Sequence, residues 1–122
     1  MGKFALDELR VYGMSEELAD LVWDLVQGWD GFAKETVGKQ MVRAGDSVGA
    51  NIAEGCGRAS RADNQRFVRI ARGSLYELRH FLRRAEKRGL ITREDKKPVA
   101  LLMRELLPAL NAYLKSLGDH GG

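Results

Sequence analysis

This chain of 122 residues, 44% hydrophobic and 30% charged, has the length and composition of a single soluble domain. It has no uncharged apolar run of about 18 residues and no secretory signal at its start, and its lone Cys56 excludes an internal disulfide, so we expect a cytoplasmic protein without a membrane span. The net charge of +3 is uneven, because residues 1–57 hold 5 basic and 10 acidic residues whereas 58–122 hold 15 and 7, which predicts head-to-tail self-association, a polyanionic partner, or both.

The first predicted helix covers about residues 7–28, with Asp7 as its N-cap. Its apolar positions recur every three or four residues: Val11, Met14, Leu18, Leu21, Val22, Leu25 and Val26. A glycine on either side of Trp29-Asp30 ends this helix. We interpret Trp23 and Trp29 as core or interface anchors rather than ligand-stacking residues.

The second predicted helix covers about residues 32–55, with two ladders of different character. One is apolar and predicts the core: Val37, Met41, Ala44, Val48 and Ile52. The other consists of small residues: Gly38, Gly45, Gly49, Ala53 and Gly57. A glycine inside a helix costs about 1 kcal/mol relative to alanine, so this ladder predicts close approach of a neighbouring backbone rather than a ligand cleft.

The third and fourth predicted helices, about 61–88 and 93–117, each begin with a capping box, at Ser60 and Thr92. The core positions expected on the third helix recur at helical spacing: Phe67, Ile70, Ala71, Ser74, Leu78, Phe81, Leu82 and Ala85. Residues 118–122 are expected to form a frayed tail. The chain 1–122 therefore predicts a single all-α domain, an antiparallel up-down-up-down four-helix bundle.

Basic residues follow the third helix, since segment 58–88 holds 10 basic and 3 acidic residues. The candidate nucleic-acid-binding residues are Arg58, Arg61, Arg66, Arg69, Arg72, Arg79, Arg83, Arg84, Lys87 and Arg88. Arginine suits bidentate phosphate contacts, and Arg58 and Arg61 beside the helix N-terminus predict a phosphate pocket. Two alternatives remain open: a solvated face, or pairing with the acidic first helix of another subunit.

Polar residues on the second and third helices predict a hydrogen-bonded structural seam between them. Its members are Ser47, Asn51, Glu54, Ser74 and Glu77. We expect Arg72 to pair with Glu54, because a buried carboxylate without a cation is costly.

Candidate catalytic chemistry finds little support in these residue patterns. Glu77 and His80 form a Glu-x-x-His, but di-iron bundles need two such motifs and two further glutamates. Cys56 has no histidine nearby in the sequence, and its glycine-flanked turn lacks the strand and the Gly-Lys-Ser/Thr of a P-loop. We therefore expect no enzyme, metal site or cofactor.

Two central motifs resemble a known family across roughly Leu9 to Leu117. They are Arg43-Ala44 with Ser47, Asn51-Ile52-Ala53-Glu54-Gly55 and Arg58, and then Ile70-Ala71-Arg72-Gly73-Ser74-Leu75 with Glu77-Leu78. This pattern resembles the four-helix-bundle family named after 23S rRNA intervening sequences, although Gly49 stands where many members have proline. The family name records where some members are encoded and is not a demonstrated activity.

The resemblance implies a bundle that assembles as a ring-shaped homopentamer. The fold is also similar to that of the accessory protein of diversity-generating retroelements, a basic pentamer that binds a reverse transcriptase and nucleic acid. We therefore expect a non-enzymatic homopentamer that binds RNA or another nucleic acid through the third helix, with a nucleic-acid-processing protein such as a reverse transcriptase as a further partner. The alternative is a protein-interaction scaffold whose basic face is used in subunit contacts or docks an acidic protein.

Overall fold

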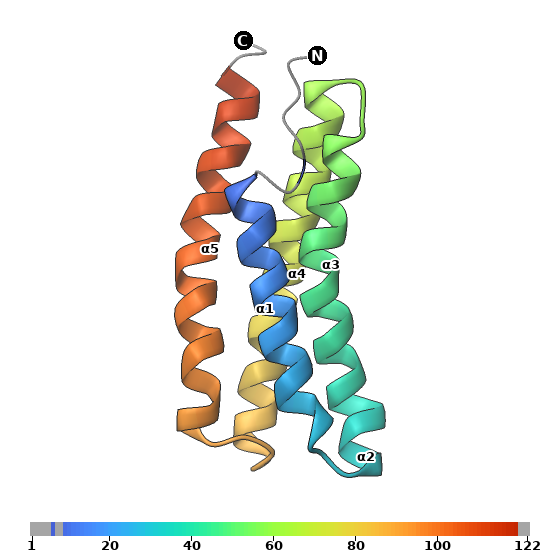
Figure 1. The fold of residues 1–122 in the computed structure, drawn as a ribbon, viewed down its shortest axis with the longest axis vertical. Coiled ribbons are helices and arrows are strands. Elements are labelled where there is room, and N and C mark those ends of the chain that lie inside the picture. The colour runs from blue at the N-terminus through green and yellow to red at the C-terminus, as the bar shows by residue number, and fades with distance from the viewer. Residues whose placement is uncertain (1–5, 7–8, 120–122) are drawn as a thin grey trace.

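The computed structural model describes residues 6 and 9–119, and every long element in this part of the chain is a helix (Figure 1). The elements are α1 (Arg10–Gln27), α2 (Gly31–Ala33), the π-helical turn η2 (Lys34–Gly38), α3 (Lys39–Cys56), α4 (Arg61–Lys87) and α5 (Arg93–Asp119). Because α2, η2 and α3 follow one another without a break, they form one long helix, and the described part of the chain has four long helices. The predicted all-α class is confirmed.

The four long helices run antiparallel, each beside its neighbour in the sequence (Figure 1). α1 packs on α3 and α5, and α4 packs on the same two helices, so α1 and α4 lie diagonally across the bundle. The α1–α3 pair and the α4–α5 pair therefore form opposite sides of the molecule. None of the helices described offers an apolar stretch of the length that a bilayer requires.

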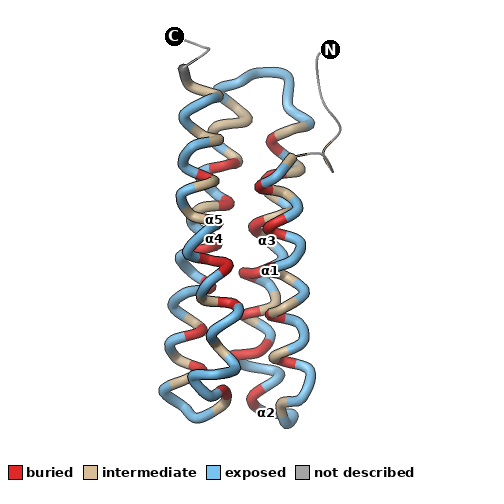
Figure 2. The backbone as a smooth tube through the Cα atoms, turned by 60° about the vertical axis from the view of Figure 1, so that its left-hand side comes forward, coloured by how far each residue is buried: buried red, intermediate tan, exposed pale blue. Residues whose placement is uncertain are grey.

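The core runs the length of the bundle along the inward sides of all four helices (Figure 2). All five residues of the apolar ladder expected on the second helix are buried. On α4, however, Ile70 is 42% exposed and Phe67 is half-buried, whereas Val68 and Leu75 are buried in their place. The predicted core positions were wrong at Phe67 and Ile70. α4 packs on both α3 and α5, and its buried side is therefore turned toward Leu75.

The helix ends match the predicted boundaries to within a few residues. The capping box at Thr92 is complete, since Thr92 Oγ1 accepts from the Asp95 N–H at 3.0 Å and Asp95 Oδ2 accepts from the Thr92 N–H at 3.0 Å. Ser60 Oγ accepts from the Asp63 N–H at 3.0 Å and starts α4. The predicted cap Asp7 lies outside the described residues, as do 120–122 of the predicted tail, whereas 118 and 119 belong to α5.

Small residues of the second long helix allow close contact with two neighbours. A Cβ on Gly38 would lie 2.7 Å from Val26 Cγ1, and one on Gly49 would lie 2.8 Å from Ser15 Oγ, both on α1. On the other flank, a Cβ on Gly55 would meet α4, 3.2 Å from the carbonyl oxygen of Asn64. The sequence predicted close approach, and the structure assigns it mainly to α1.

Candidate nucleic-acid interface

The basic residues of α4 cover a broad face of the helix, and their spacing shows which of them align. Arg61 and Arg79, Arg66 and Arg84, and Arg69 and Lys87 are three pairs separated by 18 residues. At 3.6 residues per turn, this spacing is five full turns, so each pair shares one side of the helix about 27 Å apart. All the predicted arginines and Lys87 are exposed except Arg72 and Arg84, which are half-buried.

At the predicted phosphate pocket beside the start of α4, Arg58 is paired with the chain's own carboxylates, whereas Arg61 is exposed and has no ion pair among the described residues. Arg58 pairs with Glu54 at 2.8 Å and lies 3.7 Å from Asp63, which also pairs with Arg66 at 3.1 Å. Both guanidinium groups also lie over the Phe67 ring, 4.8 Å and 4.5 Å from its centroid. Arg58 and Arg66 therefore fasten the α3–α4 turn, and the prediction that Arg58 forms a free anion site was wrong.

Four other cations form what we call the outer basic surface: Arg69, Arg84, Lys87 and Arg88. Their spacing places them on one side of α4, away from the core. Within residues 6 and 9–119, none of them has a carboxylate within 4.0 Å. This surface can therefore meet an external anion without first breaking an internal ion pair.

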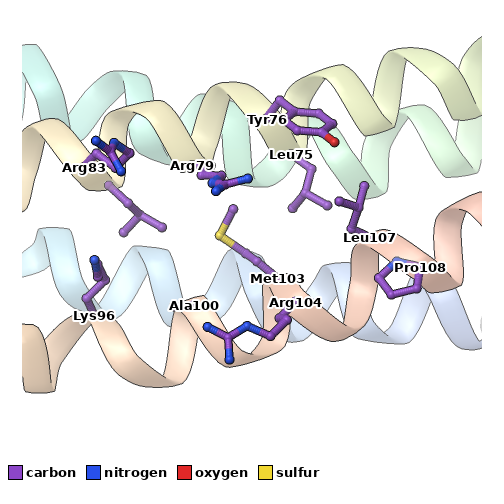
Figure 3. Close-up of a pocket in the computed structure, with 11 residues that line it drawn as sticks. Leu75, Tyr76, Arg79, Arg83, Lys96, Ala100, Met103, Arg104, Leu107 and Pro108 are labelled. Atoms are coloured by element: carbon purple, nitrogen blue, oxygen red, sulfur yellow. The ribbon is translucent and has the colours of Figure 1, made fainter.

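A groove of about 540 Å³ lies between α4 and α5, and we call it the α4–α5 groove (Figure 3). Arg79 and Arg83 line it from α4, and Lys96 and Arg104 line it from α5. Its lining is otherwise largely apolar, with Tyr76 at its end: Leu75, Leu82, Ala100, Met103, Leu107 and Pro108. The groove thus combines an apolar floor with a cationic rim.

One cation of the groove is held by an ion pair. Lys96 Nζ donates to Glu86 Oε1 at 2.5 Å, and this hydrogen bond lowers the pKa of the Glu86 carboxyl. Arg72 instead donates to the amide oxygen of Asn111 at 2.9 Å and so joins α4 to α5. The expected Arg72–Glu54 pair is therefore not formed, since Glu54 binds Arg58.

The predicted polar seam is present in its serine and asparagine members. Ser47 Oγ and Ser74 Oγ lie 2.8 Å apart across the α3–α4 contact, and Asn51 Nδ2 donates to Ser47 Oγ at 2.9 Å. Glu54 and Glu77 are exposed and lie outside this network, so the prediction was wrong for both carboxylates. Both side chains are open to water, where they need no buried partner.

Cys56 lies in a small polar cluster between the last turn of α3 and the end of α5. Its Sγ is 3.7 Å from Tyr113 Oη, which also accepts from Asn64 Nδ2 at 3.4 Å. Burial raises the pKa of Tyr113 to about 12, so its hydroxyl stays protonated at neutral pH. It cannot then serve as a base for the cysteine. Among the residues described, no group of three His, Cys, Asp or Glu side chains is arranged to hold a metal ion.

The opposite, α1–α3 side carries acidic groups and an exposed tryptophan. Trp23 is 52% exposed beside Val42 and Lys39 of α3. Partial burial, and then the nearby Asp20 carboxylate, raise the pKa of Asp46 above its ordinary value of 3.8. No cation lies within 4.0 Å of either aspartate within the part of the chain described.

We expect Asp46→Asn to raise the free energy of unfolding at pH 7 by a small amount, within about 0.5 kcal/mol, because the carboxylate is largely solvated. A raised pKa means that the folded state binds the proton more tightly than the unfolded state, so ionisation is the destabilising event. The difference between variant and wild type should therefore close as the pH falls below 3.8. Urea unfolding of both proteins from pH 7 to pH 3 measures it, and a gap that persists at pH 3 would contradict this origin.

The sequence matches the description "23S rRNA-intervening sequence protein" over residues 7–112. The chain belongs to that family. The match includes both motifs on which the resemblance was based, and it covers α1, α3, α4 and most of α5. The family assignment made from the sequence is confirmed.

A solved structure similar to this family member comes from Bacteroides thetaiotaomicron. It is described as a protein with unknown function from the S23 ribosomal protein family. The two chains share 28% identity with a TM-score of 0.77, over 86% of this chain and 98% of the other. Among curated proteins, none matches this sequence.

Two features of the interface were not predicted. The sequence pointed to Arg79 and Arg83 but not to Lys96 and Arg104, which reach the same groove from α5. Their positions depend on how α5 is aligned along α4, and the residue pattern of one helix does not predict that alignment. The sequence offered pairing of the third-helix arginines with an acidic first helix of another subunit, but it did not indicate that Arg79 and Arg83 border an apolar groove.

Proposed function

We propose that this family member is a non-enzymatic homopentamer that binds RNA or another nucleic acid through the outer basic surface of α4. The observation that carries the proposal is the absence of internal carboxylate partners for Arg69, Arg84, Lys87 and Arg88 among the described residues. Unpaired arginines on one side of a helix are suited to bidentate phosphate contacts. Such contacts fix the position of a nucleic acid without reading its bases.

The pentamer that the family resemblance implies would repeat this surface five times. Several weak phosphate contacts on one assembly act together, because each binding event raises the effective concentration of the next. A nucleic-acid-processing protein, such as the reverse transcriptase suggested by the related accessory protein, remains a further predicted partner. The same repetition would serve to present a bound RNA to it.

The test is binding of the purified protein to labelled structured RNA, single-stranded RNA and duplex DNA across a salt series. We expect binding that weakens steeply with salt, because each neutralised phosphate releases counterions. In Arg69→Glu/Lys87→Glu, affinity should fall by about tenfold to a hundredfold near about 100 mM salt. The slope of log K against log salt should become shallower by roughly 2.

The matched control is Arg10→Glu/Arg43→Glu, which makes the same charge change with exposed residues of α1 and α3. This control should retain most of the affinity. The proposal is wrong if no nucleic acid binds at low salt, or if the control loses as much affinity as the α4 variant.

A further inference from the structure

Trp23 is an exposed aromatic side chain of the acidic helix α1, and Lys34 and Lys39 line the hollow beside it. It projects from α1 one turn after Asp20, and Asp46 of α3 lies close enough to Asp20 for the two carboxylates to repel. α1 contributes four carboxylates, Glu16, Glu17, Asp20 and Asp24, against the single cation of Arg10. Tryptophan is enriched where proteins bind one another, because it buries a large area with few rotatable bonds.

The α4–α5 groove has the complementary properties. Its volume of about 540 Å³ is in the range of sites that enclose a small molecule or an aromatic side chain. Leu75, Met103 and Leu107 supply an apolar floor, and Arg79 and Arg83 stand at its rim (Figure 3). An arginine that stacks on an indole ring adds a cation–π contact, which is strongest with tryptophan.

We infer that Trp23 of one copy of this chain docks in the α4–α5 groove of a second copy, with Asp20 and Asp46 of the first facing Arg79 and Arg83 of the second. The inference rests on the self-assembly part of the proposed function and names the contact that produces it. The α1–α3 side and the groove are opposite sides of the bundle. Each copy can therefore insert its Trp23 into a second copy while its own groove holds the Trp23 of a third. Such head-to-tail contacts are heterologous, and they close into a ring when the rotation between copies permits.

The apolar floor favours a protein occupant over a nucleic acid for this groove. A phosphate backbone needs donors and water rather than leucine and methionine side chains. Arg69, Arg84, Lys87 and Arg88 do not line the groove, although Lys87 follows Arg83 by one turn of α4, so the proposed nucleic acid contacts a separate set of residues. The two roles therefore use different residues of one helix.

The experiment measures the mass of the full chain in solution by light scattering after size-exclusion chromatography. Each of two variants disrupts one half of the contact. Trp23→Ser removes the inserted indole, and Arg79→Glu/Arg83→Glu reverses the charge at the rim of the groove. Trp23, Arg79 and Arg83 are all exposed, so both variants should stay helical by circular dichroism. We expect each variant to weaken self-association by at least about tenfold.

Matched controls make the same changes elsewhere. Phe32→Ser removes the most exposed aromatic side chain described, at 82% exposure, and Lys97→Glu/Lys115→Glu reverses two exposed charges of α5 that do not line the groove. Both controls should keep the wild-type mass. Loss of mass in either control to the same extent as in the test variants would overturn the assigned contact.

Mixing the two test variants gives the decisive result. The Arg79→Glu/Arg83→Glu variant still has Trp23, and the Trp23→Ser variant still has an intact groove. One contact should therefore join them into a heterodimer that does not grow further. If both variants keep the wild-type mass, or if the mixture stays monomeric while wild type assembles, the inference is overturned. A wild-type chain that is monomeric at every concentration would instead overturn the self-assembly part of the proposed function.

Discussion

Leu78→Ala is expected to lower the free energy of unfolding by about 2–5 kcal/mol, the largest effect of any change considered for this chain. Leu78 lies on the inward side of α4 with 0% of its surface exposed, packed in the core shared by the four long helices. Removing three carbon atoms there loses their burial and leaves a cavity that the surrounding helices cannot fully close. Urea denaturation followed by circular dichroism measures the loss.

Leu101→Ala is the matched control, because it makes the same chemical change at a leucine of α5 that is 45% exposed. It should change the free energy of unfolding by no more than about 0.5 kcal/mol. All variants must be compared at one protein concentration, because the proposed self-association would stabilise the folded chain by mass action. Equal losses at the two positions would contradict the burial pattern of α4 and α5.

Gly55→Ala is expected to lower the free energy of unfolding by about 1–3 kcal/mol through overpacking of the α3–α4 contact. The added Cβ would lie 3.1 Å from Phe67 Cβ and 3.2 Å from the carbonyl oxygen of Asn64, and it would collide with Asn64 Oδ1. The amide end of Asn64 can rotate away, but the backbone oxygen and the Phe67 Cβ can move only if α3 and α4 separate. This cost exceeds the gain of about 1 kcal/mol in helix propensity.

Gly73→Ala provides the opposite expectation from the same substitution. Gly73 is exposed in the middle of α4, and a Cβ built on it meets nothing within 4 Å. Only the propensity gain applies there, so the free energy of unfolding should rise by about 0.5–1 kcal/mol. A Gly55→Ala protein that is as stable as Gly73→Ala in urea denaturation would show that the two helices can separate at little cost.

Much of the fold could be predicted because local signals agreed with one another. The boxes at Ser60 and Thr92 marked helix starts, and the ladder from Val37 to Ile52 marked a buried side at the correct spacing. The π-helical turn Lys34–Gly38 left no such signal. It inserts one residue without changing the polarity pattern, and its last residue, Gly38, lies close to Val26 of α1.

The candidate interface was less accessible to prediction than the fold. Charge counting located the basic residues, but it could not show that Arg58 and Arg66 are held by Asp63, whereas Arg69 and Lys87 have no such partner. That distinction depends on where each side chain points after the α3–α4 turn is formed. Glu54 illustrates the same limit, since it was assigned to Arg72 on another helix and instead binds Arg58 four residues later.

The placement of acidic groups on α1 and of basic groups on α4 makes the molecule an electric dipole directed across its short dimension. In the field of a second protomer or of a polyanion, such a molecule is turned before any contact is made. Productive orientations are then sampled more often than random tumbling would allow, which raises the association rate. Added salt shortens the range over which the field orients the molecule. A higher ionic strength should therefore slow complex formation more than it speeds dissociation.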